Sequence, residues 1–499
     1  MKGEIVVMTT FIIGLIILIV GGTLYGKFCT KIMAPDNRKA PAYAKQDGVD
    51  FVPMKKWKNS LINLLNIAGT GPVLGPIQGI LFGPVAFILI PIGCVLGGAM
   101  HDYFSGMLSM RNGGEQMPTL MKKYTNEAVH KIYMVFVCLL LLLVGAVFIY
   151  TPGDILATQV FGFKGLATEA STWIIYALIF VYYIVATLFP IDKIIGRIYP
   201  IFGAVLIISA IGLFGGLFLG GYKLDNVSAA NFMGIHPAAG AKLIPIFFIT
   251  VACGIVSGFH STQTAIISRS MNSEKEGRVT FYNMMIAEGF IAMVWAAAAM
   301  AVMNKGVAGS STAATDMVGI VSLDMLGPIG GILAILGVIV LPITSGDTAL
   351  RSLRLMISDY VKLDQKPQGN RLKISLPIFV VVAAILVWAK FSPDGFTALW
   401  RYFAWSNQTL AVFAFALISI YLIARGYKLA FLMSLLPGVW YAFITLTYII
   451  NAKIGFNVPM NVAYVAGAAL SVGYGILVYW YGAKHKKDKA SLEEAPIYE

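Results

Sequence analysis

The sequence predicts an all-α fold, a polytopic membrane helical bundle of about 13 transmembrane helices with a five-plus-five inverted repeat and extra helices at both ends. The first observation is composition, because 58% of the 499 residues are hydrophobic and 12% are charged, about half the usual soluble share. The others are a series of long apolar runs and a pair of interrupted runs. So few charges cannot cover a water-exposed surface, which excludes a soluble enzyme, a nucleic-acid binder and a disordered scaffold.

Apolar runs of about 20 residues, the length that crosses the hydrocarbon core as a helix, occur throughout the chain. Their continuous Leu, Ile, Val and Phe texture lacks the alternation of a membrane β-barrel, which favours helices. The first run follows Lys2 and has no small-residue cleavage site, so we expect it to be retained. The predicted spans are residues 5–26, 59–79, 84–108, 131–150, 172–190, 198–220, 243–267, 280–303, 329–350, 373–389, 404–424, 429–450 and 460–482.

The basic residues of the connections predict the orientation in the cell (inner) membrane. Seven alternate connections hold 29 of the 37 Lys and Arg residues, which places them in the cytoplasm with the C-terminus and leaves the N-terminus outside. The net charge of +13 is then an orientation signal that faces anionic lipid, and it does not indicate a nucleic-acid partner. The connections assigned to the cytoplasm are residues 27–58, 109–131, 191–197, 268–279, 351–373, 425–428 and 484–499.

The second and seventh spans are interrupted, by Gly and Pro in residues 69–76 and by Gly, Ser and His in residues 254–263. Backbone groups freed in this way are tolerated in a membrane where they line a cavity. An offset of five spans reverses the direction of the second copy, so the pair predicts an inverted repeat with the substrate site between the breaks. The alternative is close helix packing, of which the spacing of Gly75 and Gly79 is typical.

This interpretation divides the chain into five parts. They are an extra N-terminal helix in 1–30, a five-helix repeat in 59–220, its inverted copy in 241–424, two extra helices in 428–482 and a cytoplasmic tail in 483–499.

The predicted substrate site also includes Asn407 and Gln408. They follow an aromatic run and lie deeper than an interfacial belt requires, so they hydrogen-bond either substrate or another helix. The full set of substrate candidates is Gly69, Thr70, Gly71, Pro72, Gly254, Ser257, Gly258, His260, Gln263, Asn407 and Gln408.

Ionisable residues inside the membrane are costly, so each needs an explanation. Glu288 lies about 12 Å into the eighth span and is suited either to proton transfer or to a structural hydrogen bond. His260 is suited to proton coupling because an imidazole changes charge near neutral pH, and the alternative is a satisfied structural histidine. Asp347, with Thr344, Ser345 and Thr348, offers oxygen ligands to a proton or hard cation. Its alternative partner is Arg351, four residues further along the helix.

A further polar cluster, in the cytoplasmic half of the third span, is too polar to face lipid and forms either a gate or a structural network. Its members are His101, Asp102, Tyr103 and Ser105.

Motifs for other chemistry are absent from the sequence. The four cysteines have no disulfide or zinc spacing, and there is no phosphate-binding loop and no HExxH signature. We therefore expect no metal and no cofactor beyond a coupling proton or sodium ion. An intramembrane sensor or enzyme is the alternative of another class, although a sensor would usually carry a soluble domain.

Three of these segments resemble the carbon starvation protein A family of bacterial inner-membrane transporters. They are residues 101–114 (HDYFSGMLSMRNGG), residues 257–263 (SGFHSTQ) and the pair Asn407-Gln408, and the similarity covers most of the chain. The resemblance implies membership of the amino acid/polyamine/organocation superfamily, with a leucine-transporter-like 5+5 inverted repeat. It also implies uptake of peptides during carbon starvation, or of pyruvate with protons as in close relatives.

In that fold the first and sixth core helices are interrupted, and these correspond to the second and seventh spans here. The resemblance places the cation site between the first and eighth core helices, so that Thr344, Ser345 and Asp347 lie opposite residues 66–70. We therefore expect an alternating-access importer of a small solute that carries a carboxylate, because helix-start amides attract that group. The expected partners are this solute and the lipid bilayer, without nucleic acid, and the oligomeric state is left open.

Overall fold

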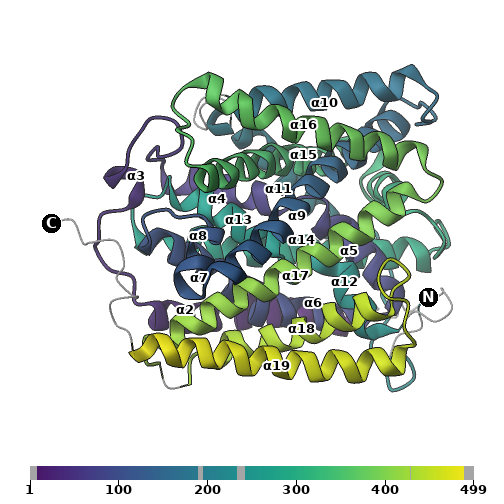
Figure 1. Ribbon diagram of the computed structural model, residues 1–499. Coiled ribbons are helices and arrows are strands. Elements are labelled where there is room, and N and C mark those ends of the chain that lie inside the picture. Colours follow the sequence, from purple (N-terminus) through teal and green to yellow (C-terminus); the bar gives the residue numbers. More distant parts are fainter. Residues whose placement is uncertain (1–7, 189–194, 233–235, 237–241, 428, 488–499) are drawn as a thin grey trace.

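A computed structural model describes residues 8–188, 195–232, 236, 242–427 and 429–487, and every regular element in these residues is helical (Figure 1). The helices are α1 (Thr9–Ile16), α2 (Gly22–Met33), α3 (Pro41–Ala44), α4 (Lys56–Ile67), α5 (Gly71–Gly79), α6 (Ala86–Gly93), α7 (Met100–Arg111), α8 (Met117–Tyr124), α9 (Glu127–Ile155), α10 (Ala170–Leu188), α11 (Ile195–Leu219), α12 (Phe248–Val251), α13 (Gly258–Ser268), α14 (Asn283–Asn304), α15 (Ala314–Val361), α16 (Gln368–Phe391), α17 (Gly395–Ala424), α18 (Leu432–Asn451) and α19 (Met460–Lys487). Short tighter or wider turns extend them at η1 (Ile17–Gly21), η2 (Ile80–Phe82), η3 (Cys94–Ala99), η4 (Leu156–Val160), η5 (Leu243–Phe247), η6 (Ala252–Gly254), η7 (Glu274–Glu276) and η8 (Arg278–Tyr282).

The predicted fold class is confirmed. In the described residues, eleven helices are long and apolar enough to cross a membrane, or twelve when the bent pair of α4 and α5 counts as one span. The remaining predicted span, 172–190, coincides with α10, whose described apolar part is shorter than the others. The total of 13 spans and the inverted repeat stay predictions. Lys2, most of the connection 191–197 and residues 488–499 of the tail lie outside the described residues.

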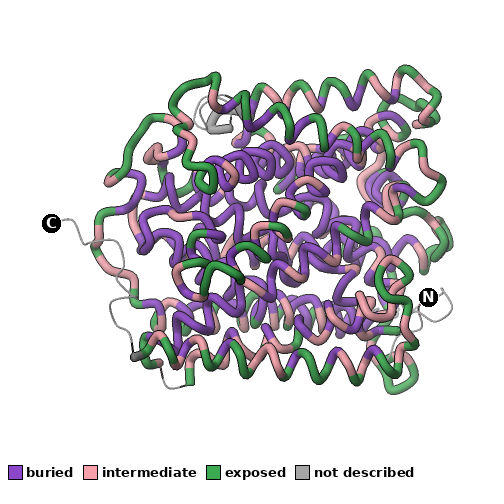
Figure 2. The backbone as a smooth tube through the Cα atoms, in the orientation of Figure 1, coloured by how far each residue is buried: buried purple, intermediate pink, exposed green. Residues whose placement is uncertain are grey.

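The helices form a densely buried centre and an exposed rim (Figure 2). Within its most apolar window, α17 is 89% buried, whereas the corresponding share is 22% for α19 and 28% for the first span, Thr9–Met33. Apolar side chains exposed on such peripheral helices are suited to contact with lipid. The extra helices predicted at both ends of the chain therefore lie at the edge of the bundle.

Both predicted interruptions break their helices, and we call the one in the second span the first break and the one in the seventh span the second break. In the second span, α4 ends at Ile67 and α5 begins at Gly71 with a bend of 47°. In the seventh span, α12 ends at Val251, Ala252 has a positive φ of 35°, and α13 begins at Gly258. A non-glycine residue with positive φ is strained, so the surrounding contacts must hold this break.

The connections cluster at two ends of the bundle. One end, which we call the basic end, contains the connections 34–55, 112–126, 269–273 and 362–367, and Tyr43 there hydrogen-bonds Asn272. The other end, which we call the far end, contains the connections 220–232, 305–313, 392–394 and 452–459. There Asn304 hydrogen-bonds the carbonyl of Lys223.

Candidate functional site

Four ionisable side chains from three helices form a completely buried cluster beside the second break, which we call the His–carboxylate cluster. Its centre is Asp102 on α7, whose Oδ1 lies 2.8 Å from Nδ1 of His101 and whose Oδ2 lies 2.9 Å from Nδ1 of His260 on α13. The other imidazole nitrogen of His260, Nε2, lies 3.5 Å from Oε2 of Glu288 on α14. The structure thus joins two sets that the sequence analysis treated separately, the polar cluster of the third span and the proton candidates His260 and Glu288.

The charge of this cluster depends on its protons. The charged groups that act on Glu288 are His260 and Asp102, so in the described residues the carboxylates are balanced by imidazoles rather than by Lys or Arg. Two carboxylates with two neutral imidazoles carry two negative charges, and protonation of both imidazoles cancels them. Since buried net charge is costly, proton uptake and proton loss are coupled to how this region is solvated.

The two other members of the polar cluster are buried on α7 and make no described contact with the His–carboxylate cluster. Tyr103 packs edge-on against Phe104 with ring centroids 5.5 Å apart, and Ser105 is completely buried. These two residues therefore fit the structural alternative better than a role beside His260.

Asp347 on α15 lies in a second buried site made of oxygen atoms. Its Oδ2 accepts a hydrogen bond of 2.6 Å from Tyr182, and its Oδ1 lies 3.0 Å from the Tyr199 hydroxyl. One turn earlier, Ser345 and Thr344 donate to the carbonyl of Leu65 at 3.0 and 3.2 Å. Leu65 is in the last turn of α4, so this polar stretch of α15 does lie against the first break.

Arg351, the alternative partner of Asp347, pairs with a different carboxylate. In the described part of the chain no ion pair within 4.0 Å joins Asp347 to Arg351, whose Nη1 lies 3.6 Å from Asp50 and whose Nη2 donates to the carbonyl of Ala186. Thr348 hydrogen-bonds carbonyls of its own helix, including that of Ser345 at 3.1 Å. Thr348 thus has a described hydrogen bond to its own helix and none to the Asp347 carboxylate.

The two tyrosines that hold Asp347 were not predicted from the sequence. Tyr182 and Tyr199 come from α10 and α11, and both stand in apolar runs where an aromatic residue indicates packing. For Tyr182, its position in the middle of an apolar span was the available signal, because a tyrosine hydroxyl needs a partner when buried, whereas Tyr199 begins its span and gives no such signal.

Asn407 and Gln408 on α17 bind the broken backbone of the seventh span. Oδ1 of Asn407 accepts from the backbone N–H of Phe259 at 2.8 Å and from the hydroxyl of Ser257 at 3.0 Å. Nε2 of Gln408 donates to the carbonyls of Val256 and Phe248 at 3.0 and 3.3 Å. Of the two alternatives for this pair, the structure favours hydrogen bonding to another helix.

The glycines of the two breaks permit close contact. A Cβ at Gly71 would overlap the Cβ of Cys253, and one at Gly69 would lie 2.5 Å from the Phe148 ring. A Cβ at Gly258 would overlap the backbone of α17, and one at Gly254 would lie 2.9 Å from Ala292. The two broken segments therefore touch each other here, and the packing alternative accounts for these four glycines.

The remaining substrate candidates are buried without a described role in either site. The Thr70 hydroxyl has no hydrogen-bond partner in the described residues, nor does either amide atom of Asn66. Gln263 donates to Thr262 at 2.9 Å on its own helix, and Pro72 lies in the first turn of α5. Unpartnered polar groups beside a break are available to a solute or to water.

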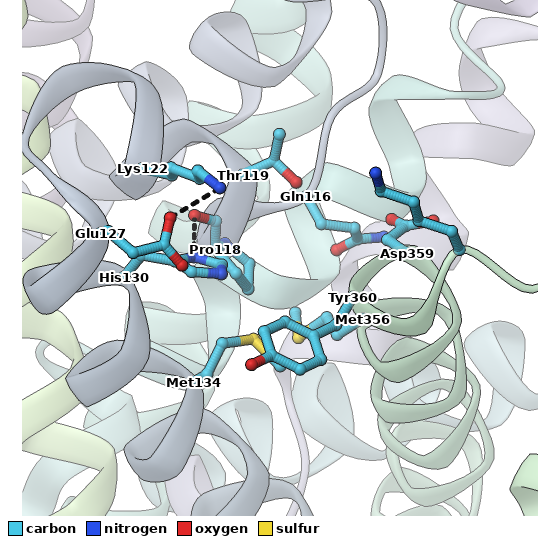
Figure 3. A pocket seen from close by; sticks show the side chains of 11 residues that line it. Gln116, Pro118, Thr119, Lys122, Glu127, His130, Met134, Met356, Asp359 and Tyr360 are labelled. Atoms are coloured by element: carbon cyan, nitrogen blue, oxygen red, sulfur yellow. Dashed lines mark hydrogen bonds and ion pairs between the residues drawn. The ribbon is translucent and has the colours of Figure 1, made fainter.

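Two cavities lie at opposite ends of the bundle. At the far end, a cavity of about 550 Å³ lies between α5, α12 and α17, one to two turns beyond the contact of Gly71 with Cys253. At the basic end, a pocket of about 370 Å³ lies between α8, α9 and the end of α15, with Lys122 paired to Glu127 at 2.6 Å (Figure 3). Only the far-end cavity is lined by the two broken helices, and the sequence analysis did not identify its lining residues Arg401 and Lys453.

Comparison with solved structures identifies a membrane transporter of similar fold. The chain is similar to the manganese transporter of Eremococcus coleocola, with a TM-score of 0.60 over 89% of this chain and 99% of that one, at 13% identity. The likeness concerns the fold. In the described residues no group of three or more His, Cys, Asp or Glu side chains is arranged to hold a metal ion.

Sequence comparisons identify the family. The model of carbon starvation protein CstA matches residues 6–164, 150–322 and 307–448. An uncharacterized membrane protein of Haemophilus influenzae is 41% identical over 58% of this chain and 89% of its own length, and the peptide transporter CstA of Campylobacter jejuni is 22% identical over 86% and 78%. The pyruvate/proton symporter BtsT of Escherichia coli is 24% identical over 53% and 45%. The resemblance is confirmed, and the chain belongs to the carbon starvation protein CstA family of membrane transporters.

Proposed function

We propose that the protein is a secondary active transporter of the cell (inner) membrane that imports peptides during carbon starvation, driven by a proton gradient. Import of pyruvate with protons is the alternative, since a relative carries that name. Both substrates bear a carboxylate. The observation that carries the coupling is the His–carboxylate cluster beside the broken helix α13.

The position of the cluster supports proton coupling. His260 lies in the first turn of α13, directly after the break, and it contacts carboxylates on two neighbouring helices. Movement of α13 relative to α7 or α14 changes the distances to Asp102 or Glu288, and with them the number of protons that the cluster holds. A change of access at the break is thereby linked to proton uptake on one side and proton release on the other.

The Asp347 site is proposed as a second coupling element. Its carboxylate, the hydroxyls of Thr344 and Ser345 and the carbonyl of Leu65 supply oxygen atoms, which are the ligands that a hard cation such as sodium prefers. If the His–carboxylate cluster proves structural, sodium bound at the Asp347 site replaces the proton as the driving ion in this proposal.

The orientation and the repeat belong to the same proposal. The distribution of Lys and Arg supports a cytoplasmic basic end with the C-terminus and an outward far end with the N-terminus. The breaks in α4–α5 and α12–α13, five spans apart, support the division into inverted repeats of 59–220 and 241–424. The relatives and the fold are those of transporters, and we infer no catalytic activity and no cofactor.

Uptake into proteoliposomes tests this proposal. We expect labelled dipeptides, tripeptides or pyruvate to accumulate inside when the lumen is alkaline, and less so without a gradient. Exchange of the proton gradient for a sodium gradient separates the two driving ions. If none of these solutes accumulates in a gradient-dependent way, the proposed transport function is wrong.

The variant His260→Gln tests the coupling site, because glutamine keeps a hydrogen bond to Asp102 but cannot take up a proton. We expect concentrative uptake to fall to the level of passive equilibration, while counterflow of labelled against unlabelled substrate continues. His130→Gln is the matched control, since His130 is also buried but contacts the carbonyl of Pro118 outside the cluster. An unchanged pH profile in His260→Gln would remove His260 from proton coupling.

A further inference from the structure

The far-end cavity leads to the second break. Its volume of about 550 Å³ is within the range of about 300–1,000 Å³ of small-molecule sites. From α17 it receives Thr397, Trp400, Arg401 and Ala404, which share one helix face by their spacing. Asn407, which holds the broken backbone of α13, follows Ala404 by one turn of the same helix. The wall of the cavity on α17 thus ends one turn before the residue that holds the broken backbone.

The charged groups that line this cavity are all basic. Arg401 and Lys453 are among the lining residues, and the described lining contains no Asp or Glu. Of the other titratable lining residues, Tyr448 is neutral as a phenol, and His236 is a neutral imidazole at neutral pH because burial lowers its pKa. Asp316 and Asp394 are exposed nearby in the sequence, but they do not line the cavity.

Two other basic side chains at the far end are neutralised. Lys305 lies 2.7 Å from Asp324, and Lys390 lies 2.8 Å from Asp154. For Arg401 and Lys453, the described residues provide no carboxylate within 4.0 Å. The two cations therefore act on whatever enters the cavity, because their charge is not cancelled by a neighbour.

We propose that this cavity is the entry site for a solute with net negative charge, a small organic anion with one or two carboxylates, and that Arg401 and Lys453 concentrate it there. The inference rests on the proposed function and narrows its substrate class. A concave site lined by one sign of charge raises the local concentration of the opposite ion. A monocarboxylate or an acidic peptide gains from this potential, a zwitterionic dipeptide gains little, and a cationic peptide is disfavoured.

The first experiment measures the charge preference of the cavity by thiol labelling, which requires no transport. A Thr397→Cys substitution places a thiol on the cavity wall, and its reaction rates with an anionic and a cationic methanethiosulfonate are each divided by the rate with a free thiol in solution. Cys29, Cys94 and Cys253 are buried and Cys138 is half-buried, so the unsubstituted protein gives the background. We expect the anionic reagent to be favoured about tenfold at low ionic strength, and the preference to shrink with added salt.

Removal of the two positive charges then tests whether Arg401 and Lys453 cause the preference for the anionic reagent. Arg401→Gln and Lys453→Gln in the Thr397→Cys protein should each reduce it several-fold, and the double variant should abolish it. Lys164→Gln is the matched control, because Lys164 is an exposed lysine in the connection after η4 and does not line the cavity. Equal reactivity of both reagents, or a preference that the double variant retains, overturns the proposal whether or not the protein transports anything.

Uptake kinetics complete the test. In Arg401→Gln and Lys453→Gln, we expect KM for pyruvate to rise several-fold at low ionic strength with kcat unchanged, and KM for a zwitterionic dipeptide to stay the same. Transport of both solutes with equal dependence on the two cations contradicts the charge selectivity and leaves the transporter function standing. Absence of all transport removes the proposed function, and the labelling result still decides whether the cavity favours anions.

Discussion

The two ends of the broken helices differ in how they are held together. At the far end, α5 packs against α12 through Gly75 and Gly79, which lie against Thr250 and Val251, and a cavity opens beside this contact. At the basic end, the segment before α4 is fastened to the end of α13, since Asn59 and the backbone N–H of Met54 both donate to the carbonyl of Ser270, at 2.7 and 3.0 Å. The broken helices are thus tied by polar contacts at the basic end and bordered by a cavity at the far end, as expected for one state of an alternating-access carrier.

The closure at the basic end is polar, and this makes it reversible. Asn63 donates to the carbonyl of Thr280 at 2.7 Å, Arg269 stacks on Phe51 at 4.9 Å, and Asp50 lies between two buried arginines. An intramolecular hydrogen bond contributes only about 0.5–1.5 kcal/mol net, because water replaces it on opening. A closure built from such contacts opens at a smaller cost than an equally large apolar interface.

The largest effect is expected from Asp50→Asn, which breaks the closed end. Arg354 is completely buried, and its ion-pair partner in the described residues is Asp50 at 3.7 Å. Loss of a partner from a buried pair costs about 3–5 kcal/mol. We expect the basic end to open and concentrative uptake to be lost, while a thiol at the buried position of Ser270→Cys becomes reactive.

Asp364→Asn is the control for this prediction, because Asp364 is exposed at the same end and accepts a hydrogen bond from its own loop. A second substitution, Arg354→Gln, should restore part of the closure in Asp50→Asn, because it removes one of the two buried arginine charges that Asp50 balances. If Ser270→Cys stays unreactive in Asp50→Asn, the ion pair is not what closes this end.

A smaller effect is expected from Asn407→Ala, which removes the side chain that holds the break in the seventh span, between the basic end and the far end. The change leaves the N–H of Phe259 and the hydroxyl of Ser257 without their acceptor in a buried region, at a cost of about 1–3 kcal/mol for each group. We expect a lower Tm in thermal unfolding and a looser break between α12 and α13. Asn407→Asp keeps the acceptor and should recover part of the loss, and Asn304→Ala at the exposed far end should change Tm little.

The breaks were predictable from sequence because they depend on local chemistry. Gly, Pro and Ser in a run of apolar residues weaken a helix wherever it lies, and the helices do end at Ile67 and Val251. The placement of Thr344 and Ser345 against the first break was also expected, through the family resemblance, and the Leu65 carbonyl meets both hydroxyls.

Contacts between distant segments were not predictable in the same way. Asp102 and His260 are 158 positions apart, and Tyr199 and Asp347 are 148 apart, so no spacing rule connects them. Asn407 and Gln408 were recognised as too polar for their depth, but a single sequence cannot distinguish a substrate ligand from a side chain that satisfies a broken backbone. Helix packing decides that choice, and it places both side chains against residues 248–259.

The smallest effect is expected from Lys305→Gln, which sharpens the contrast between paired and unpaired cations at the far end. The pair of Lys305 with Asp324 is partly exposed, with the lysine side chain 50% accessible, and exposed ion pairs contribute about 0.2–1 kcal/mol. We therefore expect a Tm close to that of the parent. The anion preference at Thr397→Cys should also persist, because Lys305 does not line the cavity and its charge is already cancelled. A loss of preference equal to that in Lys453→Gln would mean that the potential arises from the total charge of the far end, and the pairing of individual side chains would then not determine which solutes the cavity attracts.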